Sequence, residues 1–155
     1  MVFLLDWVKK VKTIMRKRST VYDCAIIQLP RIFDDRGNLT VLEECRHIPF
    51  RIARTYWIYD VPGGESRGEH AFRRVKECVV ALSGSFEVFL DDGIAQRIVT
   101  LTRAYNGLYI PNMVWRRFQN FSTNSVAVVV ASESYSKRGY IRDYSAFEKL
   151  NTRSS

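Results

Sequence analysis

The sixteen residues CVVALSGSFEVFLDDG, numbered 78–93, decide the fold class of this chain. They begin with a continuous apolar run over 78–82, which a Ser-Gly pair ends. Phe86, Val88 and Leu90 then recur at every second position, and this period predicts a strand with one buried face. The Asp-Asp-Gly triplet at 91–93 is a strong hairpin signal. The stretch therefore predicts two neighbouring strands and a hairpin that leads to a third.

Similar short segments lie on both sides of this stretch. Strands are predicted over 23–28, 39–43, 52–59, 97–101, 107–110 and 125–131, and a helix over 142–150. Turn residues separate them, such as Pro30, the Asp-Asp-Arg-Gly of 34–37 and the Pro-Gly-Gly of 62–64. Many short strands with turn chemistry between them predict an all-β protein, either a sandwich or a jelly roll such as the cupin-type jelly roll (double-stranded β-helix). Such small jelly rolls place polar side chains in the barrel mouth, where ligands bind.

The N-terminal segment has a different pattern. Residues 4–15 place apolar side chains at helical spacing with lysines between them, which predicts a basic amphipathic leader helix over 1–19, ahead of a cupin-like domain over 20–155. Residues 1–18 carry six cations and one acid, so five of the eight net positive charges lie there. Contact of residues 1–18 with a membrane surface is one interpretation. Packing on the chain's own domain, or on a second copy, is the favoured one.

Composition limits the class of protein. A chain of 155 residues with 46% hydrophobic residues has room for one domain with a core, which excludes a disordered chain. No apolar run is long enough to span a bilayer, and no signal peptide is recognisable, so a cytoplasmic protein is expected. The three cysteines are scattered and are expected to be buried free thiols. The net charge suggests an anionic partner, but no nucleic-acid fold signature accompanies it, so no nucleic acid is expected.

The stretch most informative about chemistry is RGEHAFRRVKE, residues 67–77. It places His70 between arginines, as a proton-transfer site on an anionic substrate requires. An ordinary structural histidine is the alternative. The other histidine, His47, lies in a polar turn with nothing to tie it to His70, so neither a metal site nor a cofactor is expected. Tyr56 could supply a phenolic proton, and Trp115 fits either a stacking surface for a base or a core position.

Eight short segments in a fixed order carry a resemblance to a known family. They are DRGNL (35–39), IPF (48–50), RTY (54–56), RGEHA (67–71), LSGS (82–85), GLYIP (107–111), VWR (114–116) and YIRDY (140–144). Together they resemble the bacterial dTDP-4-oxo-6-deoxyglucose 3,4-ketoisomerases, the WxcM-like cupin family, over residues 22–150.

The resemblance implies a homodimeric, metal-free and cofactor-free jelly roll that binds a dTDP-linked 4-oxo-6-deoxyhexose. It implies a ketoisomerase that moves the carbonyl from C4 to C3 through an enediol, by His-mediated proton transfer. The product would lead to 3-amino-3,6-dideoxy sugars of surface glycans such as the O-antigen of lipopolysaccharide. The implied catalytic residues are His70 and Tyr56, and the implied substrate-binding residues are Arg36, Arg67, Phe72, Arg73, Trp115 and Arg116.

One departure from the family pattern bears on activity. Phe72 stands where the family has a second histidine, and Arg73 replaces the lysine that usually follows. Two other interpretations therefore stay open: a non-catalytic dTDP-sugar-binding relative, and an isomerase or epimerase of another nucleotide sugar. Arginine at both 36 and 116 leaves the C4 configuration of the product open.

Overall fold

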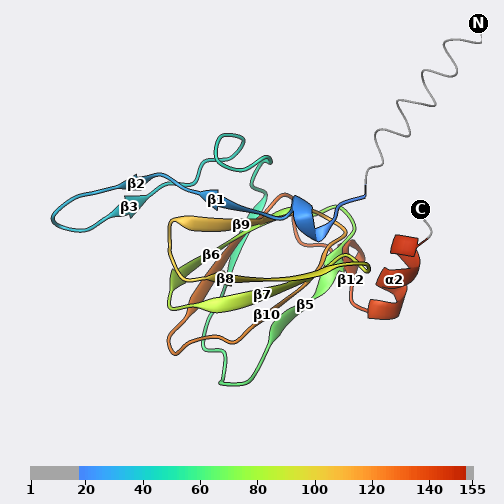
Figure 1. Cartoon of the computed structure of the whole chain (residues 1–155). Coiled ribbons are helices and arrows are strands. Elements are labelled where there is room, and N and C mark those ends of the chain that lie inside the picture. The colour runs from blue at the N-terminus through green and yellow to red at the C-terminus, as the bar shows by residue number, and fades with distance from the viewer. Residues whose placement is uncertain (1–17, 153–155) are drawn as a thin grey trace, which may run out of the picture.

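The computed structural model describes residues 18–152, and most of its regular elements are short strands (Figure 1). The strands are β1 (Ala25–Gln28), β2 (Arg31–Ile32), β3 (Leu39–Thr40), β4 (Arg54–Ile58), β5 (Arg67–Phe72), β6 (Glu77–Ser83), β7 (Phe86–Asp91), β8 (Gln96–Leu101), β9 (Asn106–Ile110), β10 (Trp115–Gln119), β11 (Val126–Ala131) and β12 (Tyr140–Ile141). Two 3₁₀ turns, η1 (Val21–Asp23) and η2 (Lys137–Gly139), and one helix, α2 (Tyr144–Thr152), complete the described elements.

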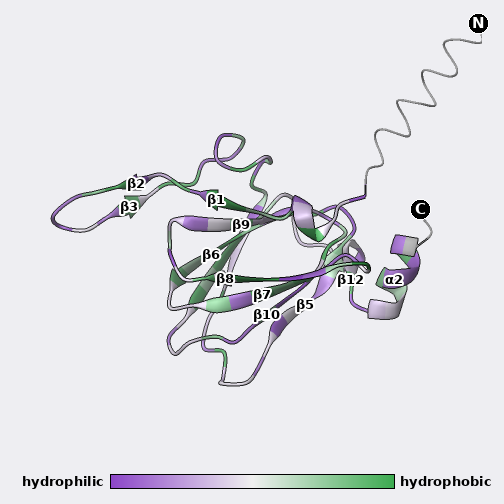
Figure 2. Cartoon of the chain, in the orientation of Figure 1, coloured by the Kyte–Doolittle hydropathy of each residue, from purple (hydrophilic) through white to green (hydrophobic). Residues whose placement is uncertain are grey.

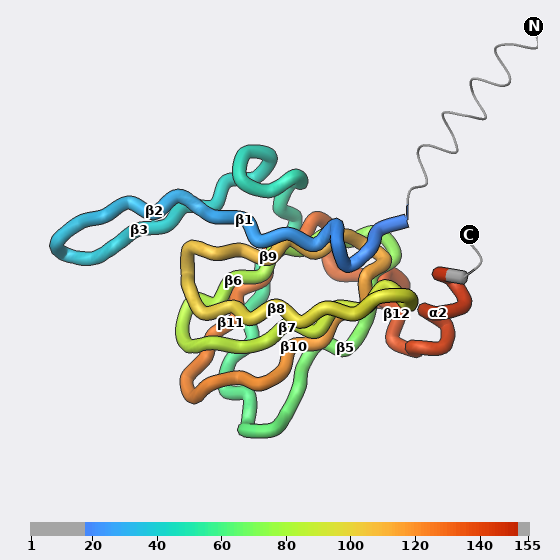
Figure 3. The backbone as a smooth tube through the Cα atoms, viewed as in Figure 1, coloured from blue at the N-terminus to red at the C-terminus, as the bar shows by residue number. Residues whose placement is uncertain are grey.

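The strands form two five-stranded sheets that face each other. The first sheet has the order β1-β9-β6-β11-β4 and the second the order β12-β5-β10-β7-β8, with antiparallel pairing between neighbours. From β5 onward the chain passes repeatedly from one sheet to the other, as Figure 3 lets the reader follow. This winding confirms the predicted all-β jelly roll.

The hydrophobic core lies between the two sheets (Figure 2). The predicted inward positions Phe86, Val88 and Leu90 are fully buried, as the period of two required. From the opposite sheet, Val79 and Val129 reach the same core. One end of the space between the sheets is lined by polar side chains instead, and this end holds the site described below.

Element bounds differ from the sequence predictions in a few places. The strand predicted over 39–43 has only two residues, β3, which pairs with β2 in a ribbon that projects from the body (Figure 1). The C-terminal helix starts at Tyr144, later than predicted, because the Asp143 carboxylate accepts a hydrogen bond of 2.7 Å from the Ala146 amide and so caps the first turn. No strand range was predicted for β2, β5, β10 or β12.

The predicted leader helix falls mainly on residues 1–17, outside the described residues. Residues 18 and 19 are described and are not helical. Here the Arg18 guanidinium donates to the carbonyls of Asn151 and Asp92, and the Val21 amide donates to the Asp92 carboxylate at 2.9 Å. The start of the described chain is therefore tied to the β7–β8 turn and to α2.

The sequence predictions on the cysteines and on membrane-spanning segments can be compared with the fold. All three cysteines are free, and Cys24 and Cys78 are buried, but Cys45 is exposed and corrects the prediction that all are buried. Cys45 lies in the irregular segment between β3 and β4, outside both sheets, with a positive φ of 57°. None of the helices within residues 18–152 is long and apolar enough to cross a membrane.

Candidate active site

A cavity of about 510 Å³ opens between the two sheets at their polar end. Its wall brings together four of the predicted site residues, His70, Tyr56, Arg67 and Arg116. The full lining is Arg54, Tyr56, Trp57, Ile58, Arg67, Gly68, Glu69, His70, Arg116, Phe118, Tyr135, Tyr140 and Arg142. These residues come from β4, β5, β10 and the segment around β12, so segments far apart in the sequence build one site.

Arg116 is the centre of a buried hydrogen-bond network. It lies opposite His70 on the neighbouring strand, and its side chain is fully buried. Its Nη1 donates to the Gly68 carbonyl and lies 3.3 Å from His70 Nδ1. Its Nε donates to the Glu77 carboxylate at 3.0 Å, and Nη2 donates to Glu77 and to the Tyr56 oxygen. Four of these contacts are hydrogen bonds that the guanidinium donates to oxygen atoms, and whether Nη1 also donates to His70 Nδ1 depends on the tautomer of the imidazole. The substrate-binding role predicted for Arg116 stays a prediction.

Glu77 is the residue of this network that sequence analysis missed. Its carboxylate is 1% exposed and forms an ion pair of 3.0 Å with Arg116. It also accepts a hydrogen bond of 2.6 Å from the Tyr56 hydroxyl. The sequence held a signal for the burial of Glu77. Residues 77, 79 and 81 are two positions apart, so Glu77 lies on the same strand face as Val79 and Ala81, which face the core. A charged residue in phase with a buried face indicates a paired, buried charge.

The nearby charges and the burial set the protonation of the two predicted catalytic groups. Burial lowers the pKa of His70 to about 2, and the charges of Arg116, Arg142 and Arg54 act in the same direction. His70 is therefore neutral at physiological pH. Burial, followed by the charge of Glu77, raises the pKa of the Tyr56 hydroxyl far above its usual value, so this phenol keeps its proton.

Two buried nitrogen atoms in the cavity wall have no hydrogen-bond partner within the described residues. They are His70 Nε2 and Arg54 Nε. Buried polar atoms of native proteins are nearly always paired, so unpaired atoms in a cavity wall indicate groups that a ligand satisfies. Arg54, Arg67 and Arg142 also form no ion pair with a carboxylate among residues 18–152. The cavity is thus positively charged and suited to an anionic ligand.

Phe72 and Trp115 lie in apolar clusters outside the cavity lining. Phe72 packs with Val75, Ala131 and Tyr140, and its ring centroid lies 4.7 Å from that of His70. The predicted closeness of positions 70 and 72 on one strand face is therefore correct. Because neighbours along a strand face opposite ways, Trp115 points away from Arg116 and packs beneath α2. The structure does not bring either predicted substrate contact to the cavity.

Arg73 and Arg36 also lie outside the cavity lining. Arg73 follows β5, with an exposed side chain, and its backbone carbonyl accepts a hydrogen bond from Asn112. Arg36 lies at the end of the β2–β3 ribbon, where its side chain is 89% exposed and pairs with Asp34 at 2.8 Å. The predicted roles of both arginines stay predictions.

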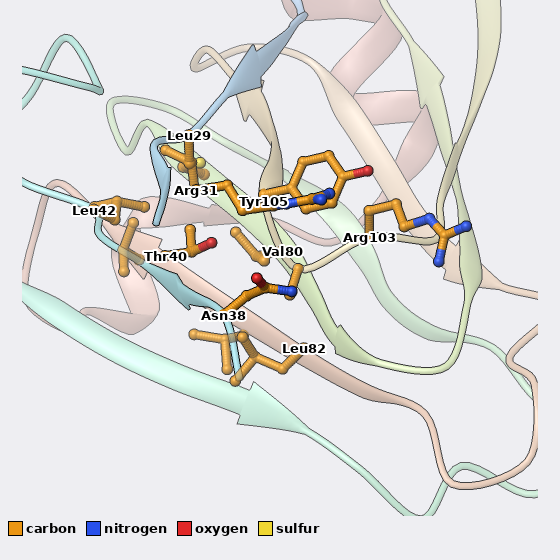
Figure 4. A pocket seen from close by; sticks show the side chains of 13 residues that line it. Leu29, Arg31, Asn38, Thr40, Leu42, Val80, Leu82, Arg103 and Tyr105 are labelled. Carbon is orange, nitrogen blue, oxygen red and sulfur yellow. The ribbon is translucent and has the colours of Figure 1, made fainter. Parts of the chain in front are cut away.

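A larger cavity of about 700 Å³ lies on the outer face of the first sheet, beside the β2–β3 ribbon (Figure 4). Its wall is mainly apolar, with Leu29, Leu42, Val80 and Leu82 among its members, and residues 18–152 contribute no histidine or carboxylate to it. Proton-transfer chemistry therefore belongs to the smaller cavity, which holds His70.

The jelly roll and its histidine- and arginine-lined cavity define a cupin-type protein with a positively charged cavity. Residues 22–152 match the family described as FdtA, WxcM-like, C-terminal, and the chain belongs to this family. It is 41% identical over 124 residues to the TDP-4-oxo-6-deoxy-alpha-D-glucose-3,4-oxoisomerase of Aneurinibacillus thermoaerophilus, covering 80% of this chain and 89% of that protein.

Solved structures agree with this assignment. A 3,4-ketoisomerase from Helicobacter canadensis superposes with a TM-score of 0.82 at 36% identity, covering 84% of this chain and 98% of that one. A sugar 3,4-ketoisomerase from Thermoanaerobacterium thermosaccharolyticum, solved in complex with TDP, has a TM-score of 0.83 at 33% identity, covering 86% of this chain and 97% of that one. The predicted family is thus confirmed.

Proposed function

We propose that this protein is an isomerase that converts TDP-4-oxo-6-deoxyglucose to the 3-oxo sugar. The relatives described above are 3,4-ketoisomerases, and the name of the curated relative specifies this TDP sugar. The observation that carries the proposal is the neutral, buried imidazole of His70 in an arginine-lined cavity. It combines a proton carrier with the positive charge that a nucleotide diphosphate requires.

The chemistry follows from the substrate. The C4 carbonyl acidifies the C3–H bond, so a neutral imidazole can remove that proton and leave an enediolate. The same imidazole returns the proton at C4, which places the carbonyl at C3. We assign this exchange to His70, whose lowered pKa leaves the imidazole neutral, and to its unpaired Nε2, which can accept a proton in the tautomer that carries its hydrogen on Nδ1. We assign the diphosphate and the developing negative charge to Arg54, Arg67 and Arg142, which have no carboxylate partner within the described residues.

We also propose that the enzyme is a homodimer. The β2–β3 ribbon extends from the body (Figure 1) and carries exposed apolar side chains, Ile32, Phe33 and Leu39. Exposed apolar groups beside the apolar cavity of the first sheet favour burial against a second copy. Because Arg36 lies on this ribbon, its predicted substrate contact would be made in the partner's cavity. A Leu82→Lys variant that stays dimeric in light scattering would count against this interface.

Phe72 favours one alternative function, a TDP-sugar-binding protein without turnover. A phenyl ring cannot carry a proton, and general acid or base groups typically contribute about 10²–10⁴-fold to rate. The arginine wall would bind the nucleotide in either case. A cytoplasmic location and a role in O-antigen sugar synthesis stay predictions from the sequence.

A time course of TDP-4-oxo-6-deoxyglucose with the purified protein in deuterated buffer, followed by NMR, tests the proposal. The expected result is the 3-oxo sugar with deuterium at the exchanged carbons. Saturable TDP binding with an unchanged sugar spectrum would assign the protein to the non-catalytic class. Absence of any TDP binding would reject both functions.

A further inference from the structure

The isomerisation moves two protons, and this inference rests on the proposed function. The first proton leaves C3 and arrives at C4, and the single imidazole of His70 can carry it. A second proton must leave the hydroxyl at O3, which becomes a carbonyl, and one must arrive at O4. Phe72 occupies the place beside His70 and cannot carry it. The hydroxyl proton therefore needs a different carrier in this chain.

Tyr56 has the surroundings that a second carrier requires. Its hydroxyl lies in the cavity wall and donates a hydrogen bond of 2.6 Å to the buried Glu77 carboxylate. Glu77 lies behind this wall, whereas Glu69, a carboxylate in the wall itself, is half exposed and paired with Arg117. Among the tyrosines that line the cavity within the described residues, Tyr56 alone has a carboxylate at hydrogen-bond distance.

Arg116 makes the pair of Tyr56 and Glu77 rigid. It holds Glu77 through two nitrogen atoms, and its Nη2 donates to the Tyr56 oxygen at 3.1 Å. The phenolic hydrogen therefore points to Glu77, and a remaining lone pair of the phenolic oxygen is left to accept a proton from the cavity. A charge-assisted bond of 2.6 Å is short enough for transfer of that hydrogen.

We propose that Tyr56 and Glu77 form a relay that carries the hydroxyl proton of the sugar from O3 to O4. As the enediolate takes up its proton at C4, the Tyr56 oxygen accepts the O3 proton and passes its own proton to Glu77. Glu77 then returns that proton to Tyr56, which protonates O4. The O3–H bond breaks and the O4–H bond forms, and both residues end as they began. Glu77 acts through Tyr56 and is a positioning residue.

The test compares Glu77→Gln with the wild-type protein in deuterated buffer, using TDP-4-oxo-6-deoxyglucose. Two rates are followed by NMR: deuterium exchange at C3, which needs His70 alone, and formation of the 3-oxo sugar, which needs the relay. The expected result is exchange within about tenfold of wild type and product formation lower by about 10²–10⁴-fold. Glu87→Gln, the same substitution on the outer side of the second sheet, is the matched control and should change neither rate.

Tyr56→Phe keeps the pair of Glu77 and Arg116 and serves as a second variant where Glu77→Gln does not fold. The same separation of exchange from product formation is expected, and the double variant should lose no more than either single variant. Thermal stabilisation by TDP checks that each cavity is intact. Wild-type product formation in either variant, or an equal fall of both rates, overturns the relay. A wild-type protein without product rejects the proposed function itself, and the relay with it.

Discussion

Protonation of His70 should make the protein less stable in mild acid, by an amount that its surroundings set. The folded-state pKa is about 2, well below the ordinary histidine value of 6.5. As the pH falls below 6.5, the unfolded chain takes up a proton at this position and the folded protein does not. The contribution to stability is therefore complete near neutral pH and is lost as the pH falls from 6.5 toward 2. Between pH 7 and pH 5 the loss is about 2 kcal/mol.

Urea unfolding at pH 7 and pH 5 measures this loss, and the carboxylates titrate in the same range. The quantity to compare is therefore the change in unfolding free energy of the wild type against that of His70→Gln, which cannot take up the proton. The wild type should lose about 2 kcal/mol more than the variant. Equal losses in wild type and His70→Gln would refute the reasoning, because His70 would then be as easily protonated in the folded state as in the unfolded state.

Three further predictions concern the cavity and the residues packed around it. Phe72→His should lower the unfolding free energy by about 2–4 kcal/mol, because it places a polar ring in an apolar cluster; its turnover should rise less than about tenfold, because the relay already carries the second proton. Gly68→Ala should cost about 1–3 kcal/mol in urea unfolding, because φ is +70° and the added Cβ would lie 2.5 Å from Arg116 Nη1; a stability equal to wild type would contradict the close packing. Arg54→Gln should weaken TDP binding by about 10–100-fold in a thermal shift titration, and Arg103→Gln, in the outer cavity, should not.

Local sequence patterns were enough to predict most of the strands and one half of the site. The period of two over 86–90 and the turn residues around it placed the core face of β7 correctly. The same rule placed positions 70 and 72 side by side, and the rings do lie 4.7 Å apart. Both results depend only on neighbours within one strand, whose geometry repeats every two residues whatever the rest of the chain does.

The other half of the site depends on which strands face each other. Tyr56, Glu77, His70 and Arg116 come from β4, β6, β5 and β10, and they meet only because the two sheets pack together. Trp115 is adjacent to Arg116 in the sequence and was predicted to contact the substrate. Because neighbours along a strand face opposite ways, it lies on the outer face of the sheet beneath α2 instead.

The sequence by itself therefore determined the fold class, the family, and the histidine that the cavity is built around. Only the tertiary structure decided that a carboxylate lies behind Tyr56, that Arg116 uses its donors within the protein, and that Phe72 belongs to an apolar cluster. The physical reason is the range of the interactions. Strand period and turn chemistry are local, whereas a buried ion pair needs two chain segments far apart in sequence to exclude water from the same place.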